Sequence, residues 1–418
     1  MKKTPKQKIL KGLKIFGKVL VAILVLLLLI ILFIRSPWGQ GILVDKAINY
    51  VEDKTGTEVQ IERLFITFDG DIALDGLYLA DKKGDTLVYS KHLEAAVPLW
   101  SLITGGPLSI DDVDWEGVRA NIIRRDSIAG FNYQFLVDAF VTADTTTVST
   151  PQDTTAFQLN LGDFNFKDFK VNYIDDILGM EANLDLSELE LDMRKTDIET
   201  MRFEVGNVFL TDTRISYKQT KPLPVSEDTT EVPMPYIKIK QLKLNKVVVD
   251  YNSIPDGIKA YASIGDFETK VPQIDLKNNI FDVDKLVLHN SKIELALSTV
   301  TSSEKTEKNT VETNSFEWPP YLVNVREVTL VDNSIKYTLD GASPTNGTLN
   351  PNAIALEKMS LGLRDIKLQD KSITADLLNA SAIEASGLNL EDLNFTLKVT
   401  DELIVVNDLK FKLNENYL

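Results

Sequence analysis

The chain has 418 residues, of which 44% are apolar, and its formal net charge of −16 reflects 61 acidic residues against 45 basic ones. This apolar content is enough for a packed core and excludes a wholly disordered chain. The acidic balance argues against a nucleic-acid-binding protein. The sequence contains no cysteine and only two histidines, His92 and His289, which argues against disulfide frameworks, thiolate metal sites and histidine-based catalysis.

The first 35 residues are basic and end in an apolar run. They hold seven Lys and one Arg with no acidic residue, and every residue from 19 to 34 is apolar. With residues 15–18 this run would form a helix about 30 Å long at ~1.5 Å per residue, which matches the hydrocarbon thickness of a bilayer. The alternative, a cleaved signal peptide, lacks a small-residue cleavage site after the run. We therefore predict a cytoplasmic basic tail over 1–14 and a transmembrane signal anchor over 15–35, which places the rest of the chain across the membrane. The anchor residues are predicted to be Val19, Leu24, Leu28, Ile31 and Ile34.

A short amphipathic helix is predicted over residues 36–56. Ser36 fits the N-cap, Pro37 fits the first turn and Gly56 fits the C-terminal end. Apolar residues recur between them at intervals of three and four. The pattern leaves open whether this helix lies on the membrane surface, plugs one end of the fold or packs on a sheet. Residues 97–104 and 131–140 are further helix candidates.

From residue 57 onward, apolar and polar residues alternate, which is typical of strands with one buried face. The recurring unit consists of two alternating apolar pairs separated by a step of two residues. Its clearest copy runs through Leu159, Leu161, Phe164, Phe166, Phe169, Val171 and Tyr173. In a regular strand the two-residue step would move the second pair to the opposite face. A β-bulge or a sharp bend at the step would keep both pairs on one face, so we expect long bent strands, or pairs of short strands that meet at a corner.

These patterns predict a mainly β fold, in which a long curved antiparallel sheet follows the transmembrane helix and the short amphipathic helix. The irregular spacing of the copies disfavours a β-helix, which would hold a fixed period. We expect an α+β segment over 57–142, a polar loop over 143–157 and the repeated strands of a groove over 158–418. The polar stretches 220–235, 299–319 and 341–352 are expected to be solvated loops.

The repeated strands place dozens of apolar side chains on one face, and few helical segments are available to cover it. A large uncovered apolar face in water would cause aggregation. The sheet therefore either closes on itself as a dry sandwich or barrel, or curls into an open trough whose lining meets an apolar ligand. Composition leaves both open. For the trough, the inward residues predicted to contact lipid are Leu161, Phe164, Phe166, Val208, Leu210, Leu242, Leu244, Leu286 and Leu288.

The order of features over residues 10–140 resembles the N-terminal portion of the AsmA-like proteins and, among them, the TamB (translocation and assembly module) family. The features that carry this resemblance are the anchor, the helix ending at Gly56, the stretch Pro98-Leu99-Trp100-Ser101-Leu102, Leu108-x-Ile110, Arg124-Arg125-Asp126 and Gly130-Phe131-Asn132. The later repeats fit this family generically. TamB proteins are usually far longer, so the resemblance leaves two alternatives: a fragment whose repeated strands continue in a longer protein, or a short relative that cannot cross the periplasm alone.

The resemblance implies an inner-membrane protein with a periplasmic, taco-like β-groove that takes part in phospholipid transport between the membranes and in outer-membrane biogenesis. The implied partners are phospholipid acyl chains, the inner membrane and, through a region outside these residues, an outer-membrane barrel protein. Two alternatives stay open, namely a scaffold that assembles outer-membrane proteins by strand augmentation and a closed-core structural protein of the envelope. The sequence shows no catalytic motif, so we predict no enzymatic activity, no metal site and no cofactor.

Overall fold

The computed structural model describes residues 36–67, 70–96, 109–140, 160–198, 200–224, 233–299 and 318–413. The predicted anchor residues Val19, Leu24, Leu28, Ile31 and Ile34 lie outside these ranges, as do the basic tail and the candidate helix over 97–104. Among the described residues, neither helix is both long enough and apolar enough to span a bilayer.

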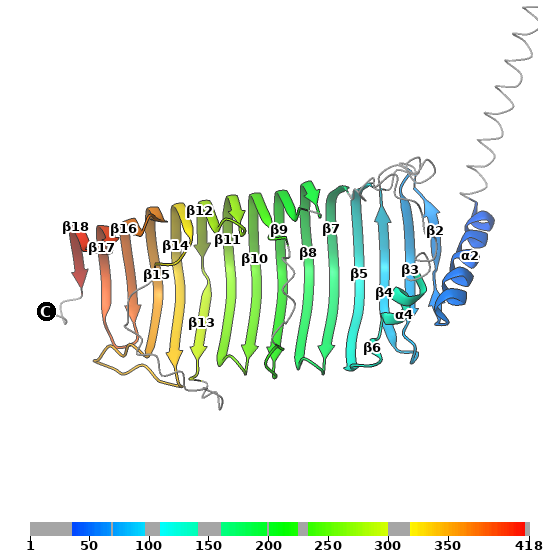
Figure 1. Ribbon diagram of the computed structural model, residues 1–418, viewed down its shortest axis with the longest axis horizontal. Helices are drawn as coiled ribbons and strands as arrows, with labels where there is room; N and C mark the ends of the chain where they lie inside the picture. The colour runs from blue at the N-terminus through cyan, green and yellow to red at the C-terminus, as the bar shows by residue number, and fades with distance from the viewer. Residues whose placement is uncertain are drawn as a thin grey trace, which may run out of the picture.

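Strands dominate the described residues, which confirms the predicted mainly β fold, and they form one sheet. Their bounds are β1 (Val59–Gln60), β2 (Arg63–Ile66), β3 (Ile72–Ala80), β4 (Thr86–Ala95), β5 (Ser109–Asp126), β6 (Gly130–Phe131), β7 (Asn160–Asp175), β8 (Met180–Asp197), β9 (Arg202–Gln219), β10 (Tyr236–Ser253), β11 (Ile258–Asp275), β12 (Ile280–His289), β13 (Lys292–Leu297), β14 (Leu322–Leu339), β15 (Ala353–Gln369), β16 (Ser372–Glu384), β17 (Asn389–Thr400) and β18 (Ile404–Leu413). The long strands lie side by side in chain order from β2 to β18 (Figure 1).

Most neighbouring strands are antiparallel, but three pairings are parallel. They join β5 to β7, β9 to β10, and β12 with β13 to β14. The prediction of an antiparallel sheet is therefore wrong at these places. The connecting segments 127–159, 220–235 and 298–321 are long enough for crossovers, which parallel neighbours require. Each of them connects the end of one strand to the start of its parallel neighbour, which lies at the other end of the strands, whereas we had expected polar stretches that mainly decorate the sheet.

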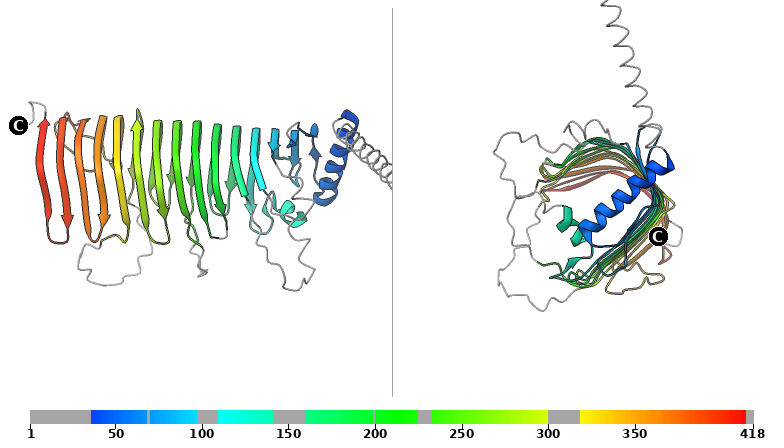
Figure 2. Two further views of the ribbon diagram at one scale, coloured as in Figure 1. Left: turned by 90° about the horizontal axis from the view of Figure 1, so that it is seen from above. Right: turned by 90° about the vertical axis from the view of Figure 1, so that its right-hand side faces the viewer.

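Two helices lie at the N-terminal end of the sheet, on its concave side (Figure 2). Helix α2 (Pro37–Thr55) begins where Ser36 Oγ accepts a hydrogen bond from the Gly39 amide at 3.0 Å, and it ends at Gly56, which has a φ of +60°. These caps confirm the predicted helix. Helix α4 (Gln134–Phe140) falls within the candidate range 131–140. Apolar side chains of both helices pack on a buried cluster formed by Val59, Leu79 and Leu87. Helix α2 therefore packs against the sheet, one of the three placements that the sequence had left open.

The sheet curls about its long axis because the long strands bend at the two-residue steps (Figure 2). The repeats contain two such steps. At the one that separates Phe166 from Phe169, the second residue has a left-handed backbone conformation, and the residues in this position include Gly117, Asp168, Asp212, Lys246, Asn290 and Asp332. At the other step, the pairings of β8 with β9 and of β10 with β11 shift register, as a bulge does. Gly, Asn and Asp adopt the left-handed conformation at least cost. The rings of Phe166 and Phe169 stack across one step with centroids 5.1 Å apart, so both sides of the step face the same way. Strands β7 and β8 stay in register through it, which identifies a shared bend and not a bulge.

Candidate functional site: the apolar inner face of the sheet

The concave face of the sheet, here called the inner face, carries apolar side chains in continuous rows. The parallel pairings place equivalent positions of successive repeats beside one another, as in Phe166 next to Trp115 and Leu244 next to Leu210. The antiparallel strands between them fill the same rows. Row 1 runs through Val113, Phe164, Leu191, Val208, Leu242, Thr269, Leu286, Val328 and Leu363. Row 2 runs through Trp115, Phe166, Leu189, Leu210, Leu244, Phe267, Leu288, Leu330 and Leu361.

The residues predicted to line a groove fall almost entirely on these two rows. Phe164, Val208, Leu242 and Leu286 lie on row 1, and Phe166, Leu210, Leu244 and Leu288 lie on row 2. Leu161 pairs with Ile110 near the N-terminal ends of β7 and β5. Leu288 is buried, whereas the other eight are half-buried. The structure therefore brings the predicted residues together on one surface and leaves most of them accessible.

The inner face is most buried along the line that follows the bend. We call this line the floor row, and its buried members are Val118, Phe169, Leu186, Thr213, Val247, Ser291 and Asn333. Burial peaks here because side chains on the concave side of a sharp bend crowd one another. The floor row thus separates a longer wall, which includes rows 1 and 2, from a shorter wall on the other side.

The polar members of the floor row satisfy backbone groups at the bend. Thr213 Oγ1 donates to the Thr211 carbonyl at 3.0 Å, and Ser291 Oγ donates to the His289 carbonyl at 2.9 Å. Asn333 accepts from the Ser291 amide through Oδ1 and donates through Nδ2 to a carbonyl of β12, both at 3.0 Å. A buried polar group costs free energy unless it is paired, so these bonds explain why polar residues stand in an apolar row.

Four aromatic side chains form the widest apolar surface of the inner face. The Trp115 ring lies 5.3 Å from Phe169 and 6.1 Å from Phe166, in edge-to-face arrangements, and Phe164 lies 5.7 Å from Phe166. The indole nitrogen of Trp115 donates to Ser90 Oγ at 2.7 Å. Trp115 and Phe169 belong to the repeats, but we had not included them among the expected lining residues. Only the lateral register of β5 and β7 shows that they share a surface with Phe166.

Within the described residues, no second layer covers the inner face beyond its N-terminal end. The apolar cluster around Val118, Phe169 and Leu186 includes side chains of β4, β5, β7, β8 and β9, which are successive neighbours in the single sheet. The helices α2 and α4 contact the cluster at the N-terminal end of the sheet. A dry sandwich, in which two sheets pack about 10 Å apart, does not describe this arrangement.

The convex outer face is polar and carries ion pairs between neighbouring strands. Lys167 lies 3.3 Å from Glu188, and Lys170 lies 3.8 Å from Asp185. Such exposed pairs contribute little free energy, typically ~0–1 kcal/mol. The contrast between the two faces shows that the alternation in the sequence separates a solvated surface from an apolar one.

One rim of the sheet holds a fully buried carboxylate. Asp175 pairs with Arg124 on the neighbouring strand and accepts hydrogen bonds from the amides of Ile177 and Leu178 at 3.0 and 3.2 Å. Burial opposes ionisation of Asp175, but the hydrogen bonds from Arg124 and from these amides outweigh it and hold its pKa below the ordinary value. The arrangement fastens β5, β7 and the turn to β8, which is a structural role.

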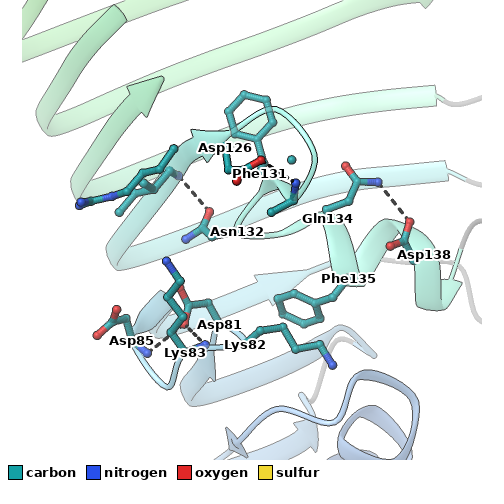
Figure 3. Close-up of a pocket in the computed structure, with 14 residues that line it drawn as sticks. Asp81, Lys82, Lys83, Asp85, Asp126, Phe131, Asn132, Gln134, Phe135 and Asp138 are labelled. Carbon is teal, nitrogen blue, oxygen red and sulfur yellow. Dashed lines mark hydrogen bonds between the residues drawn. The ribbon is translucent and has the colours of Figure 1, made fainter. Parts of the chain in front are cut away.

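A cavity of about 530 Å³ lies beside the N-terminal end of the inner face (Figure 3). Most of its polar groups serve local structure. Asp81 Oδ1 accepts from the amides of Lys83 and Asp85 at 2.8 and 3.0 Å, and Asn132 Oδ1 accepts from the Ile123 amide at 2.9 Å. Lysine, arginine and aspartate side chains of both signs line it without an arranged acid–base pair. We assign it to the packing of α4 on the sheet.

Comparisons of the chain with protein-family models, with curated proteins and with solved structures found no match. The resemblance to the AsmA-like proteins therefore rests on the order of sequence features alone.

Proposed function

We propose that this chain is anchored in the inner membrane and that its sheet forms a taco-like periplasmic groove that holds or conducts phospholipid between the inner and outer membranes. The observation that carries the proposal is that rows 1 and 2 are half-buried over nine successive strand positions, except at Val113, Thr269 and Leu288, which are buried. A soluble protein rarely exposes so large a contiguous apolar surface unless something binds there. The predicted anchor at residues 15–35 makes lipid the nearest apolar ligand.

The dimensions of the inner face suit acyl chains. Nine neighbouring strand positions, at ~4.8 Å apart, give rows roughly 38 Å long. One leaflet of a bilayer is about 15 Å deep, so a row is about as long as two acyl chains end to end. Each methylene group that moves from water to an apolar surface contributes about 0.8 kcal/mol, which offsets the cost of leaving the bilayer.

The mechanism needs no chemical step. Acyl chains would lie against the inner rows while the headgroups stay in water at the open side of the groove. Lipids would then exchange positions along the rows because neighbouring positions present similar apolar surfaces. The side chains contribute shape and desolvation only.

Lipid transfer between vesicles tests the proposal. The full chain is reconstituted through its N-terminal segment into donor vesicles that carry a fluorescent phospholipid, and transfer to acceptor vesicles is followed. We expect faster transfer than with protein-free vesicles. Transfer at the protein-free rate, with correctly inserted and folded protein, would contradict a conducting groove.

A further inference from the structure

The two walls of the inner face end in rows of different chemistry. The shorter wall ends in the tyrosine row, which runs through Ile122, Tyr173, Ala182, Tyr217, Tyr251, Ala260, Leu295, Tyr337 and Ile354. The longer wall ends in the apolar rim row, which runs through Phe203, Ile237, Ile274, Phe281, Val323, Leu368, Ile373 and Val399. Four tyrosines thus belong to the row that ends the shorter wall, whereas the row that ends the longer wall contains none, although Tyr321 packs beside it on Phe281 with ring centroids 5.7 Å apart.

The tyrosine row is continued outward by polar side chains. Tyr217 donates to Gln219 Oε1 at 2.7 Å, and Tyr173 lies 3.4 Å from Asp175 Oδ2. Ser253, two residues beyond Tyr251, donates to Asp256 at 2.6 Å. Tyrosine with an apolar ring and a polar tip is the residue type that proteins place where hydrocarbon meets water.

The tyrosine side chains are ordered by their neighbours. The rings of Tyr217 and Tyr251 stack with centroids 5.3 Å apart and an angle of 11° between the planes. Burial raises the pKa values of Tyr173 and Tyr217 above their ordinary value, and nearby oxygen-bearing groups add to the effect. Their hydroxyls therefore stay protonated at neutral pH and can donate hydrogen bonds.

The distance from the tyrosine row to the floor row matches an acyl chain. Tyr217 and Thr213, and equally Tyr251 and Val247, are separated by four residues, or about 13 Å at ~3.3 Å per residue. A leaflet is about 15 Å deep. The apolar rim row lies ten residues from the floor row, since Phe203 precedes Thr213 by that number, which is roughly twice the length of one acyl chain.

On the basis of the proposed function, we infer that a phospholipid lies across the groove in one orientation, with its headgroup at the tyrosine row and its acyl chains directed over the floor row toward the longer wall. Tyr251 and Tyr337 would donate to phosphate or ester oxygens of the headgroup, whereas the hydroxyl protons of Tyr173 and Tyr217 are already directed to Asp175 and Gln219. The apolar rim row would meet hydrocarbon or remain uncovered, since it offers no hydrogen-bond donor from its side chains.

The cysteine-free sequence allows a direct test with single cysteines on one strand, β11. Ala260→Cys marks the tyrosine row, Ile264→Cys lies opposite the floor residue Val247, and Ile274→Cys marks the apolar rim row. Each variant carries a fluorophore and is loaded with phosphatidylethanolamine that bears a spin-label quencher on the headgroup or on the acyl terminus. We expect the headgroup quencher to act about fivefold more strongly at position 260 than at 274, the factor that one hydrogen bond of average strength gives. The acyl quencher should act most strongly at 264.

The outcomes separate the orientation from the function. If neither quencher acts at any position, no lipid occupies the inner face and the proposed function fails. If the acyl quencher acts at 264 but the headgroup quencher acts equally at 260 and 274, the function stands and the orientation is refuted. The double variant Tyr251→Phe with Tyr337→Phe should keep acyl quenching and lose most of the headgroup preference. An unchanged preference would refute the role of the hydroxyls.

Discussion

Two carboxylates on row 2 should abolish lipid binding while the sheet stays folded. Phe166 and Leu210 flank Leu189 on this row, so aspartates at the two positions stand two strand spacings, or about 10 Å, apart. An acyl chain that keeps clear of these charges loses apolar contact for about four methylene groups, or ~3 kcal/mol at ~0.8 kcal/mol each. This corresponds to roughly 100-fold weaker binding. Both side chains are half-buried and face the open side of the sheet, so the carboxylates can remain hydrated.

The assay measures binding of a fluorescent phospholipid to the purified full chain, with far-UV circular dichroism as the check on folding. The control variant, Asn183→Asp with Val331→Asp, adds two carboxylates to exposed positions of the outer face. We expect the control to bind like the unaltered chain. Undiminished binding by Phe166→Asp with Leu210→Asp, or an equal loss in the control, would refute the assignment of the inner face as the binding surface.

Three further predictions concern the folded state. Phe169→Ala on the floor row should lower the free energy of unfolding by about 3–5 kcal/mol, whereas Leu244→Ala on half-buried row 2 should cost roughly 1–2 kcal/mol; equal losses in urea titrations would indicate that row 2 is covered. Gly162→Ala should destabilise the protein by about 1–3 kcal/mol, because the new methyl group would overlap the backbone of β5. As a control, Gly41→Ala in open space on α2 should stabilise the protein by ~0.5–1 kcal/mol. Thermal unfolding compares the two variants, and a Gly162 variant of unchanged stability would contradict the close approach of β5 and β7. Asp175 has a lowered pKa in the folded state, so its stabilising contribution is complete above the unfolded value near 3.8 and is lost as the pH falls below it. Asp175→Asn should therefore be clearly less stable than the unaltered chain at pH 7 and nearly equal to it at pH 2; a constant difference across this range would contradict the ionised state of the carboxylate.

The bend in the strands could be predicted from the sequence because the two-residue step admits only a few geometries. If Phe166 and Phe169 both face the core, the chain between them must reverse one alternation, and Asp168 does so through its left-handed conformation. The second form that we had expected, two short strands meeting at a corner, occurs once among the described strands, where β12 ends at His289 and β13 begins at Lys292. The periodicity of apolar residues therefore predicts which face of the sheet each side chain is on.

The sequence could not give the neighbours of each strand. The stretch 220–235 is polar and carries several prolines, which indicates a loop but does not show which strand ends it connects. It links the end of β9 to the far end of β10, which makes these two strands parallel and places Tyr217 beside Tyr251. Lateral rows such as the tyrosine row depend on this register. Each member can be read from the sequence, but only the pairing of the strands shows that these residues lie side by side.

Photocrosslinking in living cells tests the central claim most directly, namely that the inner face is open and holds lipid. A photoreactive amino acid is placed at Leu244 or Leu288 on row 2 and, as matched controls, at Asn245 or His289, the next residues on the same strands, which face outward. Mass spectrometry of the irradiated, purified protein should find phospholipid attached at the two inner positions and not at the two outer ones. Inner positions that capture no phospholipid, or no more than the outer positions do, would contradict an open lipid-holding face.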